Sequence, residues 1–237
     1  MTQAFEKPVC AVVGVGPGSG EALARRFASA GHAVALVARR TALIERLASE
    51  LPGALAFECD VSNEGAVAET FAVIATEMGP VDTLVYNIGR GVWGAVDKVS
   101  SEDFEQAWRS NALGLFHCAR QAIPAMKAKA SGNIVVIGAT ASRRGVAGTA
   151  AFAPAKMAQR ALAESMARYL GPAGIHVSLI VVDGVVRRSE TRPQFADRAP
   201  DSFIEPDAIA AAALTLTLQD RSAWSFEVDL RPFNERW

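Results

Sequence analysis

The stretch Val9-Cys-Ala-Val-Val-Gly-Val-Gly-Pro-Gly-Ser-Gly20 sets the arrangement of the rest of the chain. Its apolar start, Val9 to Val13, predicts a buried strand, and four glycines follow within seven positions before a helical pattern begins. Glycine permits positive φ and close approach of a ligand to the backbone. A helix start adds free N–H groups and the positive end of a dipole. Together these parts predict an anion site suited to pyrophosphate; the alternative is a glycine-rich turn without a ligand.

The composition is that of a near-neutral protein with a large core. Its 237 residues, half of them hydrophobic, carry a formal net charge of −1. This length allows one large α/β domain or two small ones, and we interpret residues 1–237 as one domain. Such a chain buries roughly 70% of its unfolded surface and needs no stabilising cross-links. The interspersed charges give no reason to expect nucleic acid or an anionic membrane as partner. No uncharged run reaches the ~18–20 residues of a membrane-spanning helix.

Two further observations bear on the cellular compartment of the protein and on the state of its cysteines. The N-terminus shows no signal-peptide pattern, so we expect a cytoplasmic protein. The cysteines Cys10, Cys59 and Cys118 lack the spacing of a disulfide set or a metal site. We interpret them as buried free thiols and expect no metal.

Short continuous apolar runs alternate with longer helical patterns along the chain. This alternation predicts a doubly wound, Rossmann-type α/β fold, with a parallel sheet of about seven strands covered by helices on both faces. Ligands of such sheets bind at the carboxyl ends of the strands. The expected strands are Val9–Val13, Ala33–Ala38, Ala54–Cys59, Thr83–Asn87, Asn133–Ile137, His176–Val182 and Phe226–Leu230. The expected helices are at about 19–31, 41–51, 63–78, 101–129, 151–170 and 206–219. The charged, proline-bearing residues 187–206 predict a short substrate lid.

The residues after the second strand, Ala38-Arg39-Arg40, bear on the choice of dinucleotide. Sites that prefer NAD place an acid there for the ribose 2′-hydroxyl, whereas an arginine suits a 2′-phosphate. Here Ala38 takes the place of the acid, and two guanidinium groups follow that can bind phosphate through paired hydrogen bonds. We therefore expect NADP(H) as the preferred cofactor and NAD(H) as the alternative. The alternative interpretation is that Arg39 and Arg40 begin a solvated helix and bind no phosphate.

The glycine spacing Gly14-x-x-x-Gly18-x-Gly20 resembles the T-G-x-x-x-G-x-G pattern of the short-chain dehydrogenase/reductase family, with Val13 in place of the threonine. Further matches follow in order: Asp60, Asn87, Gly89 and Asn111, so that the resemblance covers roughly residues 8–230. It implies that Asp60 binds the adenine amino group and that Asn111 organises the active-site lysine and a water. The cofactor-binding residues inferred from this resemblance and the residues above are Gly14, Gly16, Pro17, Gly18, Ser19, Gly20, Arg39, Arg40, Asp60, Val61, Asn87, Ile88, Gly89, Lys156, Gly184 and Val185.

The family's catalytic pattern is Y-x-x-x-K with a serine thirteen residues before the tyrosine. By resemblance, the lysine corresponds to Lys156, but Phe152 stands at the tyrosine position and Ala139 at the serine position. Neither side chain can donate a proton, so we interpret the chain as a divergent member that lacks both catalytic hydroxyls. Three residues are candidates to replace them. Thr140 and Ser142 could turn inward through a register shift, and the carboxyl group of Asp183 could donate a proton if it were buried.

The expected function is therefore that of an NADP(H)-dependent short-chain oxidoreductase. It would transfer a hydride to a small or mid-sized carbonyl, imine or activated alkene without the usual tyrosine acid. The alternative is a catalytically inactive dinucleotide-binding pseudoenzyme that acts as a sensor or partner subunit. The helical patterns at 101–129 and 151–170 are apolar on more than one face, which suits the family's pairing of these helices between subunits. We expect a homodimer or homotetramer.

Overall fold

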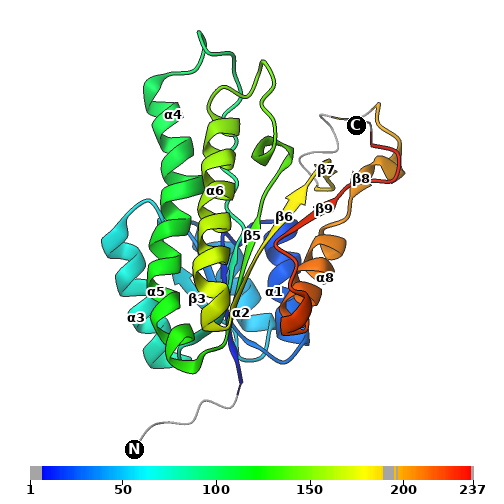
Figure 1. Cartoon of the computed structure of the whole chain (residues 1–237). Helices are drawn as coiled ribbons and strands as arrows, with labels where there is room; N and C mark the ends of the chain where they lie inside the picture. Colours follow the sequence, from blue (N-terminus) through cyan, green and yellow to red (C-terminus); the bar gives the residue numbers. More distant parts are fainter. Residues whose placement is uncertain (1–6, 189–194, 196, 236–237) are drawn as a thin grey trace, which may run out of the picture.

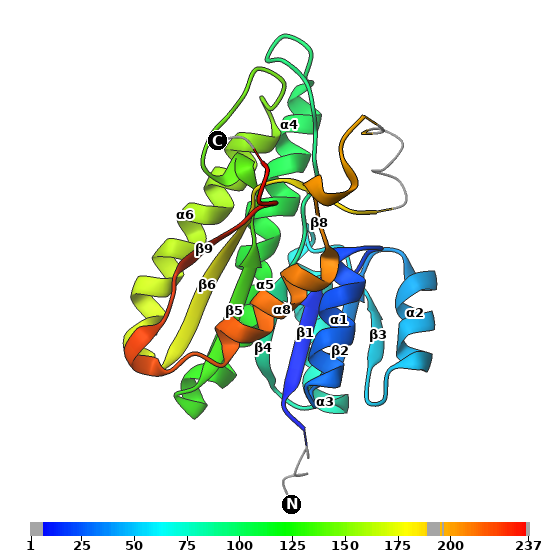
Figure 2. The same ribbon diagram turned by 90° about the vertical axis from the view of Figure 1, so that its right-hand side faces the viewer.

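The computed structural model describes residues 7–188, 195 and 197–235. A seven-stranded sheet forms its centre (Figure 1). All neighbouring strands are parallel, and Figure 2 shows their order, β3-β2-β1-β4-β5-β6-β9. The strand order reverses between β1 and β4, which is where ligands of doubly wound sheets bind. The expected sheet is confirmed. Its strands are β1 (Val9–Val13), β2 (Ala33–Ala38), β3 (Leu55–Glu58), β4 (Val81–Tyr86), β5 (Gly132–Ile137), β6 (Ile175–Val182) and β9 (Glu227–Leu230).

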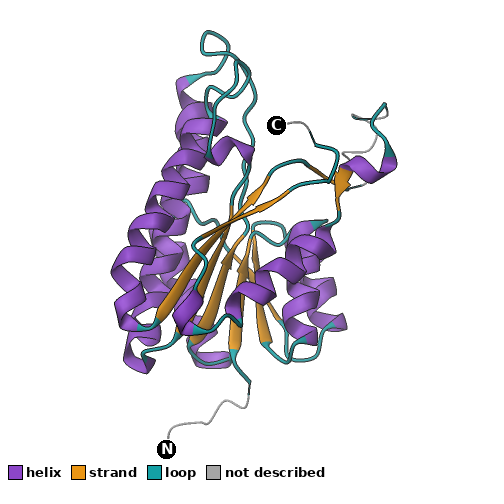
Figure 3. Ribbon diagram, turned by 45° about the vertical axis from the view of Figure 1, so that its right-hand side comes forward, coloured by secondary structure: helices purple, strands orange, loops and turns teal. Residues whose placement is uncertain are grey.

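Helices cover both faces of this sheet (Figures 2 and 3). Those on one face, which share one hydrophobic core with the sheet, are α1 (Ser19–Ser29), α2 (Thr41–Glu50) and α8 (Pro206–Thr217). Those packed in the core on the other face are α3 (Glu64–Glu77), α5 (Gly114–Lys129) and α6 (Phe152–Leu170). Within the described residues, none of the helices combines the length and the apolarity needed to span a lipid bilayer.

The two cores explain why β1 is apolar at every position. Along β1, Val9, Ala11 and Val13 belong to one core, while Cys10 and Val12 belong to the other. Successive side chains of a strand point to opposite faces, so a strand covered on both faces has no exposed position for a polar residue. The three cysteines are free and buried, as expected.

The helix expected at 101–129 contains a change of helical type. It begins as α4 (Ser101–Trp108), where the side chain of Ser100 accepts a hydrogen bond from the backbone N–H of Asp103 at 3.0 Å. A π-helical turn at Arg109–Leu113 follows, and the chain then continues as α5. Such turns occur often at functional sites. The turn contains Asn111, one of the expected site residues.

The segment expected to form a lid is described only in part. Short strands β7 (Val185–Val186) and β8 (Phe203–Ile204) pair in parallel at its two ends. Residues 189–194 and 196 lie outside the described residues. The lid function therefore stays a prediction, and the structure supplies the positions of its anchoring strands.

Candidate active site

Two adjoining cavities lie at the carboxyl edge of the sheet. The first has a volume of about 280 Å³ and the second of about 920 Å³. They form one continuous cleft because several residues line both, namely Gly14, Gly16, Arg40, Asn87 and Gly89. The cleft runs across the point where the strand order reverses, at the carboxyl ends of the strands, where the sequence predicts ligand binding.

The glycine loop between β1 and α1 forms the floor of this cleft. Gly14 has φ 91°, and a Cβ there would lie 2.7 Å from Cγ1 of Ile88. A Cβ on Gly20 would lie 2.7 Å from the carbonyl oxygen of Gly14, so the loop folds back on its own backbone. Asn87 fastens the loop to the end of β4 by donating from Nδ2 to that same oxygen at 2.9 Å. No side chain caps α1, which leaves its N-terminal dipole available to an anion.

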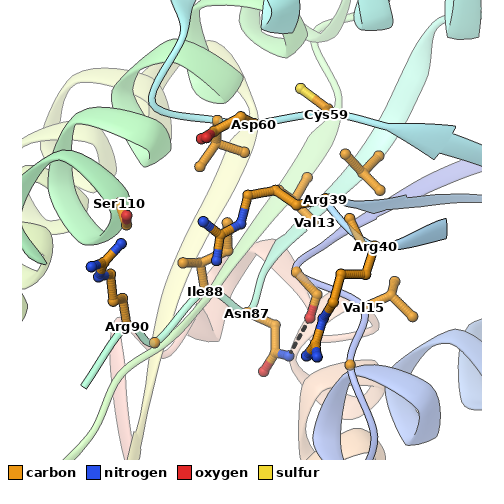
Figure 4. Close-up of a pocket in the computed structure, with 16 residues that line it drawn as sticks. Val13, Val15, Arg39, Arg40, Cys59, Asp60, Asn87, Ile88, Arg90 and Ser110 are labelled. Carbon is orange, nitrogen blue, oxygen red and sulfur yellow. Dashed lines mark hydrogen bonds between the residues drawn. The ribbon is translucent and has the colours of Figure 1, made fainter. Parts of the chain in front are cut away.

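Positive charge dominates the first cavity. Figure 4 shows the side chains of Arg39 and Arg90 reaching into it from opposite sides. Arg40 lies beside the glycine loop, and Asp60 also lines the cavity. Partial burial disfavours the ionised form of Asp60, but hydrogen bonds from Ser62 and the charges of Arg39 and Arg90 outweigh this effect and lower the pKa of Asp60. One ionised acid therefore faces three guanidinium groups, and the cavity suits an anionic ligand that also carries hydrogen-bond donors.

The second cavity has apolar and aromatic walls. Trp93 is 70% exposed, and its ring centroid lies 5.3 Å from that of the buried Phe152. Phe195 and Ala139 also line this space, which contains no acidic side chain among the described residues. Its cationic groups belong to Arg40, Arg188 and Lys156. The walls therefore suit a planar, apolar substrate held beside cationic groups.

Lys156 lies one helical turn after Phe152 on α6 and is 2% exposed. Its Nζ donates to the carbonyl oxygens of Ile88 and Ile137, both at 3.0 Å, and to Oε1 of Gln159 at 2.9 Å. None of these acceptors carries a charge, and burial lowers the pKa of Lys156 to about 7. The amine is thus poised between its charged and neutral forms near neutral pH.

Asn111 lies behind this lysine rather than in the wall of either cavity. Its Nδ2 donates to the backbone oxygens of Ala107 at 2.8 Å and Arg90 at 3.2 Å, while its own backbone oxygen accepts from Nε2 of Gln159 at 2.9 Å. Gln159 therefore links Lys156 to the π-helical turn. The Oδ1 atom of Asn111 is buried without a hydrogen-bond partner in the described structure. A buried acceptor of this kind favours a water or ligand group as its missing partner.

The low pKa of Lys156 predicts a dependence of stability on pH. Between about pH 7 and the ordinary lysine value of 10.5, the unfolded chain binds a proton that the folded chain lacks. Stability should therefore rise with pH in this window, because the penalty for burying the ammonium group, complete below pH 7, is progressively relieved. The free energy of unfolding of the wild type, relative to that of Lys156→Met, should increase by about 2 kcal/mol between pH 7 and pH 9.

Urea denaturation of both proteins at the two pH values, without added ligand, measures this difference. Lys98→Met is the matched control, because the Lys98 side chain is 75% exposed. A difference between wild type and Lys156→Met that stays constant with pH would contradict the assignment.

The three candidate replacements for the missing hydroxyls do not line either cavity. Thr140 donates its hydroxyl to Oδ1 of Asp183 at 2.5 Å, and Asp183 is paired with Arg231 at 3.0 Å. The hydroxyl of Ser142 accepts from the backbone N–H of Ala139 at 3.1 Å. Each of the three side chains is thus engaged with a neighbouring group rather than exposed in a cavity wall.

The other expected site residues are brought together at the cleft. Every expected cofactor-binding residue lines one of the two cavities except Gly18, which lies at the start of α1. Phe152, Ala139 and Lys156 line the second cavity. Sequence reasoning missed Arg90 and Gln159 and treated Arg188 only as part of the lid. Two of these residues could have been found from their positions in the sequence. Arg90 directly follows the expected site residue Gly89, and Gln159 lies three residues after Lys156 on the same helix face.

Comparison with known proteins agrees with this geometry. A family model described as short chain dehydrogenase matches residues 8–197. The chain belongs to this family. It is 30% identical over 181 residues to the 3-oxoacyl-(acyl-carrier-protein) reductase MabA of Mycobacterium tuberculosis, covering 76% of this chain and 70% of that relative. It is also 30% identical to the meso-2,3-butanediol dehydrogenase of Serratia marcescens, over 92% of this chain and 90% of the relative.

Solved structures share the fold over nearly the whole length. A short-chain dehydrogenase from Rhodopseudomonas palustris superimposes with a TM-score of 0.82 and is 30% identical, over 95% of this chain and 99% of that chain. An alcohol dehydrogenase from Thermococcus sibiricus, complexed with 5-hydroxy-NADP, superimposes with a TM-score of 0.86 and is 26% identical. The alignment covers 98% of this chain and 99% of that chain.

Proposed function

We propose that the protein is an NADP(H)-dependent oxidoreductase that reduces a small or mid-sized carbonyl, imine or activated alkene. The observation that carries this proposal is the continuous cleft in which the glycine loop, the two arginines after β2 and Lys156 meet. Membership of the short chain dehydrogenase family and the likeness to an NADP-type complex support it.

The residues of the cleft fit a phosphorylated dinucleotide from end to end. Arg39 and Arg40 would hold the 2′-phosphate, since they follow β2 where an NAD site places an acid. Asp60, ionised as described above, would accept from the adenine amino group. Glycine at position 20 lets the loop keep its tight turn, since a Cβ there would collide with the backbone of Gly14 and Val15, and this turn would seat the pyrophosphate. Lys156 and Gly184 line the far end, where they would hold the nicotinamide ribose and ring.

Reduction adds a hydride from NADPH and a proton to the acceptor double bond, with NADP⁺ as the oxidised product. Trp93 and Phe152 would exclude water from one side of the substrate and orient a planar acceptor between their rings and the cofactor end of the cleft. Phe152 and Ala139 offer no proton. The proton would therefore come from solvent or be carried by the substrate, which favours imines protonated before binding and conjugated alkenes protonated by water.

A second candidate function is that of a dinucleotide-binding pseudoenzyme. The apolar pair Phe152 and Ala139 in the cavity wall favours it, and so do the three backbone and amide acceptors that hold the amine of Lys156. Such a protein would bind NADPH but oxidise none of it across carbonyl, imine and enone substrates. The cytoplasmic location, the single domain and the homodimer or homotetramer stay predictions.

Titration of the purified protein with NADPH and NADH, followed by cofactor fluorescence, tests the cofactor assignment. NADPH should bind at least about tenfold more tightly than NADH, because a hydrogen bond to a charged group contributes about 1.5–3 kcal/mol. Arg39→Ala combined with Arg40→Ala should remove most of this preference and leave NADH binding within about twofold. If the protein bound neither dinucleotide, both candidate functions would be wrong. Tighter binding of NADH than of NADPH would contradict the proposed preference for NADP(H).

A further inference from the structure

Arg188 lies directly over the start of α1. A Cβ placed on Gly18 would be 2.8 Å from Cγ and 2.9 Å from Cδ of Arg188, so the aliphatic part of the arginine occupies the space that a side chain at position 18 would need. Gly18 also has φ 92°, a backbone conformation that residues with a side chain rarely adopt. Arg188 thus covers Gly18, which explains why this glycine alone among the expected cofactor residues does not line a cavity.

The backbone around Arg188 is held by the pairing of β7 with β8. The N–H of Arg187 donates to the carbonyl oxygen of Ile204 at 2.9 Å and extends this ladder by one residue. Successive side chains of an extended segment point in opposite directions. Arg187 accordingly points to Glu205, with its Nε 2.5 Å from Oε1, whereas Arg188 lies in the wall of the second cavity with the glycine loop.

We infer that Arg188 clamps the pyrophosphate of the bound dinucleotide against the glycine loop. The inference rests on the proposed function. The N-terminus of α1 supplies roughly half an elementary positive charge, and Arg188 adds a full charge with paired N–H donors suited to phosphate oxygens. The loop residues Gly16, Pro17 and Ser19 line the same cavity as Arg188. A phosphate seated on the loop would therefore have backbone N–H groups on one side and a guanidinium group on the other.

Two ligands that differ in the pyrophosphate separate this role from general attraction of anions. NADPH contains the pyrophosphate, whereas adenosine 2′-monophosphate carries only the adenosine end with its 2′-phosphate. Arg188→Gln should weaken NADPH binding by about 10- to 100-fold and change the binding of adenosine 2′-monophosphate by less than twofold. Arg188→Lys, which keeps the charge but loses the paired donors, should fall between the wild type and Arg188→Gln.

Arg187→Gln is the matched control, because it removes the same charge one position earlier, where the side chain is paired with Glu205. It should change NADPH binding by less than twofold. NADPH fluorescence, displacement by adenosine 2′-monophosphate and thermal unfolding of each variant are measured at low and high NaCl concentration. Binding of NADPH to the wild type should weaken more with salt than binding to Arg188→Gln.

The inference is overturned if Arg188→Gln loses no more NADPH affinity than Arg187→Gln, or if it weakens both ligands equally. Either result would leave the proposed function standing, provided that the wild type binds NADPH. A wild type that binds no NADPH would overturn the clamp and the proposed function together.

Discussion

Replacing Phe152 by tyrosine and Ala139 by serine in the same chain should raise NADPH-dependent reduction of simple ketones by about 10²- to 10⁴-fold. Both positions already line the second cavity with Lys156. Phe152 lies one turn before Lys156 on α6, so a hydroxyl on its ring would enter the same cavity as the lysine amine. General acid catalysis of this size corresponds to about 3–5 kcal/mol of barrier lowering.

The experiment compares initial rates of NADPH oxidation for the wild type, each single variant and the double variant on a panel of ketones. Phe152→Leu with Ala139→Ser is the matched control, because it alters packing without supplying the phenol. The double variant must also bind NADPH as tightly as the wild type. No gain in a folded double variant that binds the cofactor would show that the cavity is no longer shaped for carbonyl reduction. The pseudoenzyme candidate would then be favoured.

Gly20→Ala should destabilise the ligand-free protein by about 1–3 kcal/mol and sharply weaken dinucleotide binding. The added Cβ would lie 2.7 Å from the carbonyl oxygen of Gly14 and 2.9 Å from Cα of Val15, and both are backbone atoms. They have little freedom to retreat, because the N–H groups of Gly14 and Val15 donate to the carbonyl oxygen of Val37 at 2.8 and 3.2 Å. The strain therefore has to be taken up by the loop that forms the floor of the cleft.

Gly16→Ala provides a matched control from the same loop. A Cβ on Gly16 would meet nothing within 4 Å, so the ligand-free protein should be as stable as the wild type or slightly more stable. Thermal unfolding without ligand measures both variants, and the midpoint of Gly20→Ala should fall by several degrees. Equal midpoints for Gly20→Ala and Gly16→Ala would contradict the described packing of the loop.

Much of the fold could be predicted from the sequence because local patterns report burial. A strand covered on both faces is apolar at every position, as β1 is, and glycines mark where the chain turns at its end. Since the carboxyl ends of parallel strands share one edge of the sheet, residues that follow different strands, such as Arg39, Asp60 and Asn87, could be placed in one cleft. Their order along the chain also carried the family resemblance.

Other features of the site depend on contacts between distant parts of the chain. Asp183 pairs with Arg231 and accepts from Thr140, and neither Thr140 nor Asp183 lines a cavity. This pairing requires β6 and β9 to be neighbours in the sheet, and the sequence contains no signal for it. The link from Lys156 through Gln159 to the π-helical turn likewise depends on how α6 packs against that turn.

The sequence by itself determined the Rossmann-type sheet and the glycine loop, because periodicity and spacing record which positions are buried and where strands end. The family resemblance indicated most of the residues that line the cleft. Only the tertiary structure decided which side chains lie in the cleft and which lie outside it. It placed Arg188 over Gly18, although 170 positions separate them in the sequence. Side-chain partners depend on which elements are adjacent in space, and adjacency is a property of the folded chain rather than of any local pattern.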